Sequence, residues 1–231
     1  MDLVQNFLNN FDLYGLLFLL IRVAAVLSCI MVHELSHGLA ARLLGDPTAK
    51  RAGRLSLNPL RHIDPVGFVM MLIAHVGWAK PVPVDMRQFK HPKRDMALTA
   101  LAGPISNFLL ALMALGFSSL LLPFAMRDSG NVCAYIILFL CYIAVLSVGL
   151  GLFNLIPIPP LDGSRVLFSL LPDRLYLQLM RWERYLMLLV IALAYFGFFA
   201  GPLNACMGWV LEGFCAVTRF PFAYIQYFFG F

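Results

Sequence analysis

Two histidines and a glutamate in one short stretch have the spacing of a catalytic metal site. They are His33, Glu34 and His37, within the run His-Glu-Leu-Ser-His. On an α-helix, residues i and i+4 share one face, so both imidazoles could bind the same metal ion. Glu34 would then be placed to take a proton from a metal-bound water molecule. Chance produces this motif in roughly 1% of chains of this length, so it predicts a functional metal site.

A catalytic zinc ion needs three protein ligands and an open fourth position, so one more ligand is required. Asp162 is the favoured third ligand because it follows a long uncharged run that ends in Pro157-Ile158-Pro159-Pro160-Leu161. The prolines cannot continue a helix, so the chain should become extended there, and Gly163 would allow a tight turn. Doubly charged zinc with one carboxylate ligand and one carboxylate base is also neutral overall, which lowers the cost of burial.

Other interpretations of these residues stay open at this point. The chain has five further histidines and glutamates that are candidates by type: His62, His75, His91, Glu183 and Glu212. The histidines are expected at polar interfaces, and neither glutamate has turn-forming neighbours. Asp162 could also be a solvated aspartate in a helix-ending loop. The cluster at His33 could be a buried polar network that ties helices together.

The elements that must position these residues belong to a membrane protein. Of the 231 residues, 61% are hydrophobic and 13% are charged, and the mean hydropathy is +0.83. An ordinary soluble domain is about 45–50% apolar and about 25% charged. The composition excludes a soluble globular enzyme, a disordered chain and a nucleic-acid-binding protein. The chain is therefore expected to be integral to the membrane.

The apolar runs predict an all-α polytopic membrane protein with about four to six transmembrane helices. Four runs reach the length of about 20 residues that a spanning helix needs: Leu13–Leu44, Ala97–Met126, Ser129–Leu161 and Tyr185–Leu211. The first carries the His-Glu motif and should stop at Gly45-Asp46-Pro47. A shorter run, Val66–Ala79, predicts a membrane-associated hairpin or re-entrant segment at the entrance of the active site.

The chain is expected to form a single membrane domain, 1–231, because no internal repeat is visible. Its catalytic core would cover about residues 14–170 and its C-terminal helices about 176–231. The stretch Pro202–Phe231 fits either another span or an interfacial helix. The five cysteines form no framework, and their spacing does not specify whether Cys133, Cys206 or Cys215 pair.

The positions of the basic residues predict the orientation. Of the 17 lysines and arginines, ten fall between Arg42 and Arg94, and four more lie between residues 162 and 184. Because cytoplasmic loops are enriched in such residues, segments 45–95 and 162–184 are expected to face the cytoplasm. The motif near the end of the first span and Asp162 would then approach the metal from this same side.

Five motifs together resemble the site-2 protease family of intramembrane zinc metalloproteases. They are HELSHG at 33–38, GRLSLNPLRHIDPVG at 53–67, GWAKPVPVD at 77–85, AGPISN at 102–107 and NLIPIPPLDG at 154–163. These motifs cover most of residues 28–168 in the expected order. The chain is too short for the PDZ or CBS domains of larger relatives. It resembles a minimal prokaryotic-type member of the family.

The resemblance implies an enzyme with one zinc ion per chain. His33, His37 and Asp162 would be the ligands and Glu34 the catalytic base, within a core of three spans. Such an enzyme would hydrolyse peptide bonds within or near transmembrane segments of membrane proteins. Its partners would be a substrate with a transmembrane helix and the lipid bilayer, with no nucleic acid. The location implied is a prokaryotic inner or plasma membrane, with the active site toward the cytoplasm.

Two asparagines and one extended stretch are candidates for substrate binding. The resemblance supports a contact between Asn107 and the substrate backbone, although a packing or capping amide fits equally well. Asn154 is a second candidate, and it could also satisfy the backbone groups freed by the break at Pro157. Gly53–Asn58 could be an edge strand that pairs with an unwound substrate, or a plain hairpin. Arg22 is expected to extend toward the outer interface.

Three other functions are compatible with parts of the pattern. A catalytically silent homologue could act as a membrane scaffold or chaperone, but it would not need Glu34. A different membrane zinc peptidase would use a glutamate as third ligand, and neither Glu183 nor Glu212 has a supporting motif. A transporter predicts paired broken helices in two halves, whereas only the break at 157–160 is evident.

Overall fold

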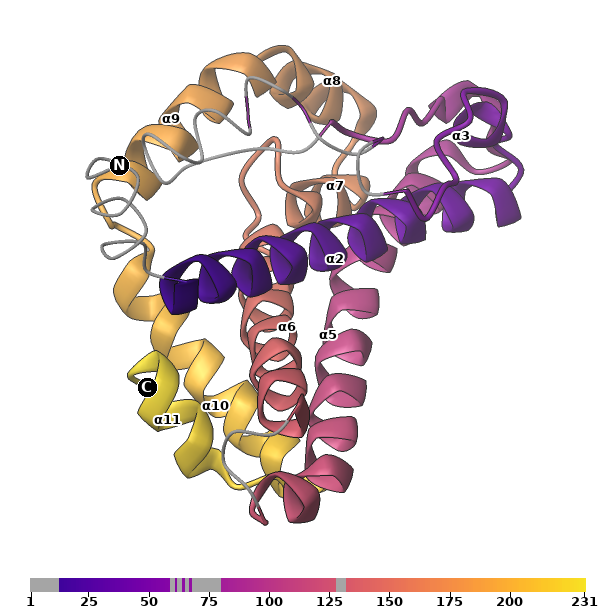
Figure 1. Cartoon of the computed structure of the whole chain (residues 1–231). Coiled ribbons are helices and arrows are strands. Elements are labelled where there is room, and N and C mark those ends of the chain that lie inside the picture. The colour runs from indigo at the N-terminus through magenta and orange to yellow at the C-terminus, as the bar shows by residue number, and fades with distance from the viewer. Residues whose placement is uncertain (1–12, 59–60, 62–63, 65–66, 68–79, 128–131) are drawn as a thin grey trace, which may run out of the picture.

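The computed structural model describes residues 13–58, 61, 64, 67, 80–127 and 132–231, and these residues are helical with connecting turns (Figure 1). Three of the described helices are long and apolar enough to cross a membrane. They are α2 (Leu13–Leu43), α5 (Pro92–Ala125) and α6 (Val132–Asn154). No β-strand occurs among the described residues, which confirms the predicted all-α membrane fold.

The helix α2 ends where the sequence predicts, and a buried aspartate shapes the turn that follows. Gly45 adopts a φ of +111°, which an L-residue with a side chain rarely reaches. Asp46 has no exposed surface, and its Oδ1 accepts the backbone N–H of Thr48 at 2.8 Å. The one-turn helix α3 (Thr48–Arg51) begins at that residue. The chain therefore reverses sharply after the His-Glu motif.

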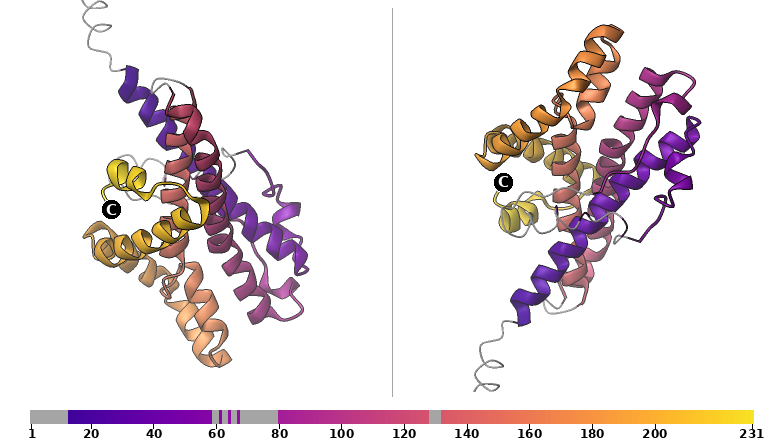
Figure 2. Two further views of the ribbon diagram at one scale, coloured as in Figure 1. Left: turned by 90° about the horizontal axis from the view of Figure 1, so that it is seen from below. Right: turned by 90° about the horizontal axis from the view of Figure 1, so that it is seen from above.

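The helices α5 and α6 lie side by side, and α2 runs across them (Figure 1); two further views show the same crossing (Figure 2). Small residues allow this close packing: Ala25 and Cys29 of α2, Ala111, Ala114 and Ser118 of α5, and Ala144 and Ser147 of α6 are all buried. In a membrane, lipid gives helices little hydrophobic reason to associate, so close backbone approach supplies the contact.

Large apolar side chains along α5 are left open to the surroundings. They recur every three or four residues and are each more than half exposed: Leu109, Met113, Phe117, Leu120 and Phe124. A soluble protein would cover such a row, whereas in a membrane it faces lipid tails. The outer surface and the span lengths together make this an integral membrane protein.

Arg22 has a partner within the protein. Its Nε donates a hydrogen bond to the hydroxyl of Tyr142 on α6 at 2.7 Å, and the guanidinium lies 5.4 Å from the ring centroid. The tyrosine therefore satisfies this mid-span charge through a hydrogen bond and a cation–π contact.

The five cysteines are all free, so Cys133, Cys206 and Cys215 do not pair.

The predicted fourth span, Tyr185–Leu211, is not one straight helix. It is divided between α9 (Glu183–Tyr195) and α10 (Ala200–Thr218), and the bend between their apolar parts is 79°. The turn contains Gly197, with a φ of +73°. The described residues thus contain three spanning helices, or four if the bent pair is one broken span.

The remaining helices are short. α7 (Asp162–Ser169) and α8 (Asp173–Arg181) precede the bent pair, and α11 (Phe222–Phe229) follows it. The eight residues of α11 are too few to cross a bilayer. Gly53–Asn58 forms a turn and irregular chain, so the predicted edge strand is absent there. The predicted re-entrant segment, Val66–Ala79, lies outside the described residues except for Gly67.

Candidate metal centre

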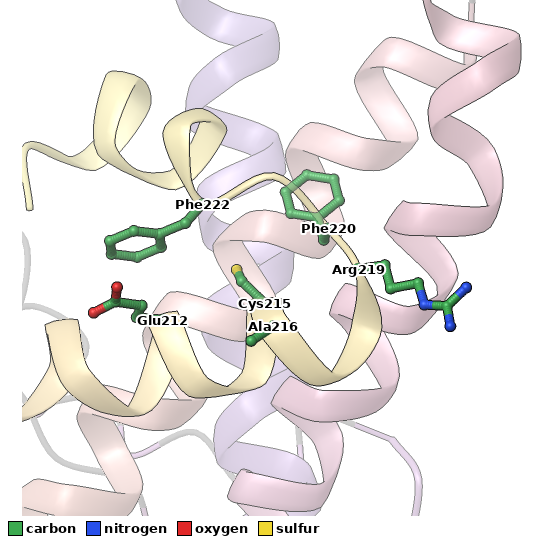
Figure 3. Close-up of a pocket in the computed structure, with 6 residues that line it drawn as sticks. All are labelled: Glu212, Cys215, Ala216, Arg219, Phe220 and Phe222. Carbon is green, nitrogen blue, oxygen red and sulfur yellow. The ribbon is translucent and has the colours of Figure 1, made fainter.

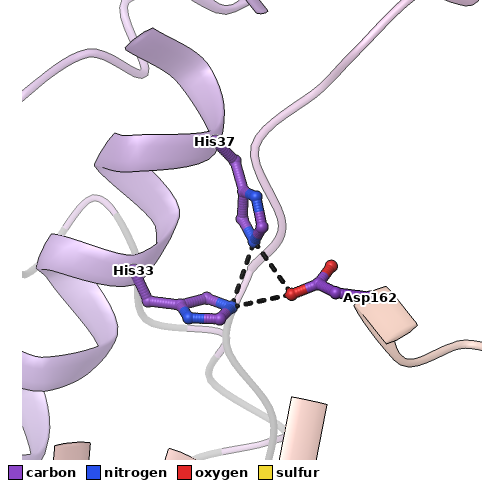
Figure 4. Close-up of side chains that lie close together, drawn as sticks. All are labelled: His33, His37 and Asp162. Atoms are coloured by element: carbon purple, nitrogen blue, oxygen red, sulfur yellow. Dashed lines mark hydrogen bonds and ion pairs between the residues drawn. The ribbon is translucent and has the colours of Figure 1, made fainter. Parts of the chain in front are cut away.

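The structure brings His33, His37 and Asp162 together (Figure 4). The two histidines lie one turn apart on α2, and Asp162 is the first residue of α7. The two Nε2 atoms are 3.0 Å apart, and each lies 3.2 Å from Oδ2 of Asp162. The predicted trio therefore converges from two helices that are far apart in the sequence.

The spacing of these three atoms fits one metal ion. Ligands bound tetrahedrally to zinc at about 2.0–2.1 Å lie roughly 3.3 Å from one another, close to the distances here. The Nδ1–H of His37 donates to the backbone carbonyl of Thr99 at 2.8 Å, so its neutral ring has a lone pair on Nε2. That lone pair faces the carboxylate of Asp162, which, when ionised, accepts hydrogen bonds but has no proton to donate to the imidazole. A cation between these atoms would satisfy all three.

The pKa of the Asp162 carboxyl group favours its ionised form. Its burial acts to raise the pKa, but hydrogen bonds and positive charge from the protonated forms of His33 and His37 outweigh this effect. The pKa of Asp162 is consequently lowered to about 2. The Oδ2 atom that faces the histidines is fully buried. An anionic, dehydrated oxygen of this kind is a suitable ligand for a divalent cation.

The proline-rich turn after α6 delivers Asp162 to the histidines. The helix ends at Asn154, whose Nδ2 donates to the carbonyl of Leu150 at 2.9 Å. Gly163 was expected to allow a tight turn, but its φ is not in the left-handed region. Instead, α7 starts so close to the end of α6 that a Cβ on Gly163 would lie 2.2 Å from the carbonyl oxygen of Leu155. This glycine is needed for close approach.

Glu34 contacts an extended segment, residues 80–85, that passes over α2. Its Oε2 accepts the backbone N–H of Val82 at 2.9 Å. Pro81 and Pro83 have no N–H, so Val82 provides the one backbone donor of this Pro-Val-Pro run. The segment is also fixed at its end, where the backbone N–H of Asp85 donates to Asp46 at 2.8 Å. The sequence does not predict this contact, because the alternating prolines leave Val82 as a backbone donor without indicating its acceptor.

The helix α5 packs directly against both imidazoles. A Cβ on Gly103 would lie 2.5 Å from Nε2 of His37 and 2.6 Å from Cε1 of His33. Asn107, one turn further along, has no exposed surface, and its Nδ2 lies 3.3 Å from Nδ1 of His33. The substrate-binding roles of Asn107 and Asn154 stay predictions.

Other residues of ligand type do not join this group. Glu183 pairs with Arg165 at 3.4 Å, and His91 precedes the first turn of α5. Glu212 borders a hollow of about 340 Å³ between α10 and α11. Arg219 also lines this hollow, and its side chain points away from Glu212 (Figure 3). Within the part of the chain that the structure describes, the trio is the one group of three with this spacing. His62 and His75 lie outside the described residues.

A largely buried trio of metal-ligand type between apolar membrane helices defines an integral membrane metalloprotein. The sequence profile of Peptidase family M50 matches residues 21–197. The chain therefore belongs to this family, the site-2 proteases.

Curated relatives agree with this assignment. A Bacillus subtilis protein named a putative zinc metalloprotease is 34% identical over 202 residues, which cover 87% of this chain and 90% of that protein. A Methanocaldococcus jannaschii protein with the same description is 30% identical over 161 residues, covering 70% and 76%. No solved structure gives a significant match. The family and these names identify a membrane metalloprotease whose cofactor is zinc.

Proposed function

We propose that this protein is an intramembrane zinc endopeptidase that cleaves peptide bonds within or near transmembrane segments of membrane-protein substrates. The observation that supports this most directly is the convergence of His33, His37 and Asp162 among helices with an apolar outer surface. A substrate that diffuses in the bilayer would reach the centre through lipid. Its helix must unwind locally, because helical hydrogen bonds and packing shield the peptide bonds.

The residues of the centre divide the chemistry between them. His33, His37 and Asp162 would hold the zinc ion, which when bound supplies an acidified water molecule and a polarised substrate carbonyl. Glu34 would accept the proton of that water and pass it to the leaving amine. The N–H of Val82 holds Oε2 of Glu34 in place, so the other carboxylate oxygen is left to take the proton.

We further propose that the centre opens toward the cytoplasm of a prokaryotic cell. The basic residues from Arg42 to Arg94 support this orientation, because they lie between the last turn of α2 and the first turn of α5. The bacterial and archaeal relatives support the prokaryotic membrane. A silent scaffold is the alternative, but the fixed position of Glu34 favours catalysis.

Zinc content tests the centre without any known substrate. The native protein, purified in detergent without chelator, should contain about one zinc ion per chain. Asp162→Ala should lose most of it, whereas the control Glu212→Gln on α10 should retain it. Zinc that is unaffected by Asp162→Ala would mean that a different third ligand is used. A folded native protein without zinc would support the silent scaffold instead.

Glu34→Gln tests the assigned base. This variant should keep its zinc, because Glu34 is not a member of the trio. It should lose at least a hundredfold in the cleavage of a quenched fluorescent peptide with an apolar, helix-destabilised segment, reconstituted in liposomes. Cleavage at the native rate would contradict the role of Glu34 while leaving the zinc site intact.

A further inference from the structure

One face of α5 forms the outer wall of the metal centre. Thr99, Gly103 and Asn107 are spaced four residues apart, so they lie along the same side of the helix. The carbonyl of Thr99 accepts from Nδ1 of His37, Gly103 touches both rings, and the amide of Asn107 lies beside Nδ1 of His33. On each imidazole, Nδ1, the nitrogen that does not face Asp162, thus lies beside a polar group of α5.

We infer that Asn107 is a positioning residue whose side-chain oxygen accepts the Nδ1–H of His33 and so keeps Nε2 of His33 available for the metal. This inference rests on the proposed zinc centre. A neutral imidazole that binds a metal through Nε2 carries its proton on Nδ1, and this N–H normally has an acceptor. Thr99 provides that acceptor for His37. For His33, the neighbouring polar group is the amide of Asn107.

The surroundings of Asn107 favour this role over a contact with the substrate. Its side chain has no exposed surface, and its Oδ1 is buried without a hydrogen-bond partner among the described residues. Rotating the amide group of Asn107 by 180° about its Cβ–Cγ bond exchanges the positions of its oxygen and nitrogen. Oδ1 would then accept the Nδ1–H of His33. With the amide nitrogen as donor instead, His33 would have to carry its proton on Nε2, where the ion must bind.

Two substitutions of Asn107 that nearly keep its shape distinguish a role as hydrogen-bond acceptor from its other possible roles. Asn107→Leu removes the acceptor and should weaken zinc binding by roughly 10–100-fold, measured by competition with a chromophoric chelator. Asn107→Asp keeps an acceptor at the same place and should bind zinc within a few-fold of the native protein. Ser118→Ala is the matched control, since it removes a buried hydroxyl from the same helix roughly 16 Å away.

Each of the following outcomes would overturn the inference. Asn107→Leu could bind zinc as tightly as the native protein, or Asn107→Asp could lose as much affinity as Asn107→Leu. A substrate contact would instead make Asn107→Leu raise KM and leave zinc affinity unchanged.

If circular dichroism shows that the leucine variant does not fold, ¹⁵N-histidine NMR tests the hydrogen bond of His33 instead, by comparing the zinc-loaded native protein with Asn107→Asp. A His33 Nδ1–H signal that does not shift between them contradicts the hydrogen bond. A native protein without zinc would refute the proposed function itself.

Discussion

Gly103 shows how a single residue without a side chain sets the geometry of the metal centre. A Cβ at this position would meet the imidazoles of both His33 and His37 at 2.6 Å or less, well inside van der Waals contact. The rings cannot move away freely because Nδ1 of His37 is bonded to Thr99 on the same helix. Gly103→Ala must therefore separate α5 from α2 or rotate the rings.

Gly103→Ala should weaken zinc binding at least tenfold, because small displacements of ligand atoms disturb the tetrahedral geometry. Chelator competition measures the dissociation constant. Gly208→Ala on α10 is the matched control, since nothing lies within 4 Å of a Cβ there. Native zinc affinity in Gly103→Ala would show that the helices can separate without affecting the ligands.

At the residue scale, side-chain spacing was predictable and backbone contacts were not. The spacing of the His-Glu motif is enough to predict that its two histidines lie close together, because a helix places residues i and i+4 on one face. The residues around Asp162 indicate that it is the third ligand, but they do not predict its distance of 3.2 Å from the histidines. That distance depends on how closely Gly163 approaches Leu155. A backbone N–H is present at almost every residue, so the sequence does not indicate that the N–H of Val82 donates to Glu34.

At the scale of elements, two part-buried hydrogen bonds join the segment 80–85 to Glu34 of α2 and to Asp46 in the turn that follows it. Asp46 alone joins two parts of the chain: it accepts from the backbone N–H of Thr48 and from that of Asp85, each at 2.8 Å. Its carboxylate is entirely buried. Asp46→Ala would leave both donors without this acceptor, in a place that water reaches poorly.

Asp46→Ala should lower the free energy of unfolding by about 1–3 kcal/mol per unsatisfied donor. Arg87→Ala is the control, because its exposed ion pair with Asp85 contributes about 0–1 kcal/mol. Thermal unfolding in detergent measures both changes, and limited proteolysis should cut the alanine variant of Asp46 faster within residues 80–90. Equal effects of the two substitutions would show that the segment does not depend on Asp46.

The elements also show where sequence patterns are insufficient. The end of α2 was predictable, because Gly45 and Pro47 interrupt a helix whatever surrounds them. The bend between α9 and α10 was not, because an apolar run of this length is compatible with one straight span or two shorter helices. Gly197, Gly201 and Pro202 are local signals of a break, but they do not specify a bend of 79°.

At the scale of the whole molecule, the distribution of basic residues predicts which side of the membrane each loop faces. Leu57 precedes α5 and Met126 follows it, and both are more than 70% exposed. In a cysteine-free background, Leu57→Cys should react with a membrane-impermeant maleimide only after cells are permeabilised. Met126→Cys should react in intact cells. The reverse pattern would place the metal centre near the outer face.

The metal also links distant parts of the whole chain, because its proposed ligands come from α2 and from α7, on either side of the α5–α6 pair in the sequence. Zinc that binds the native state but not the unfolded state adds about 2.7 kcal/mol to stability at a free concentration one hundred times Kd. Stripping the protein with a chelator should therefore lower Tm, and added zinc should restore it. Asp162→Ala should unfold at a Tm that does not respond to zinc, because the ion would lose its one ligand from α7. A zinc-dependent Tm in that variant would show that the ion stabilises α2 alone, and an unchanged Tm in the stripped native protein would show that helix packing holds α7 in place without it.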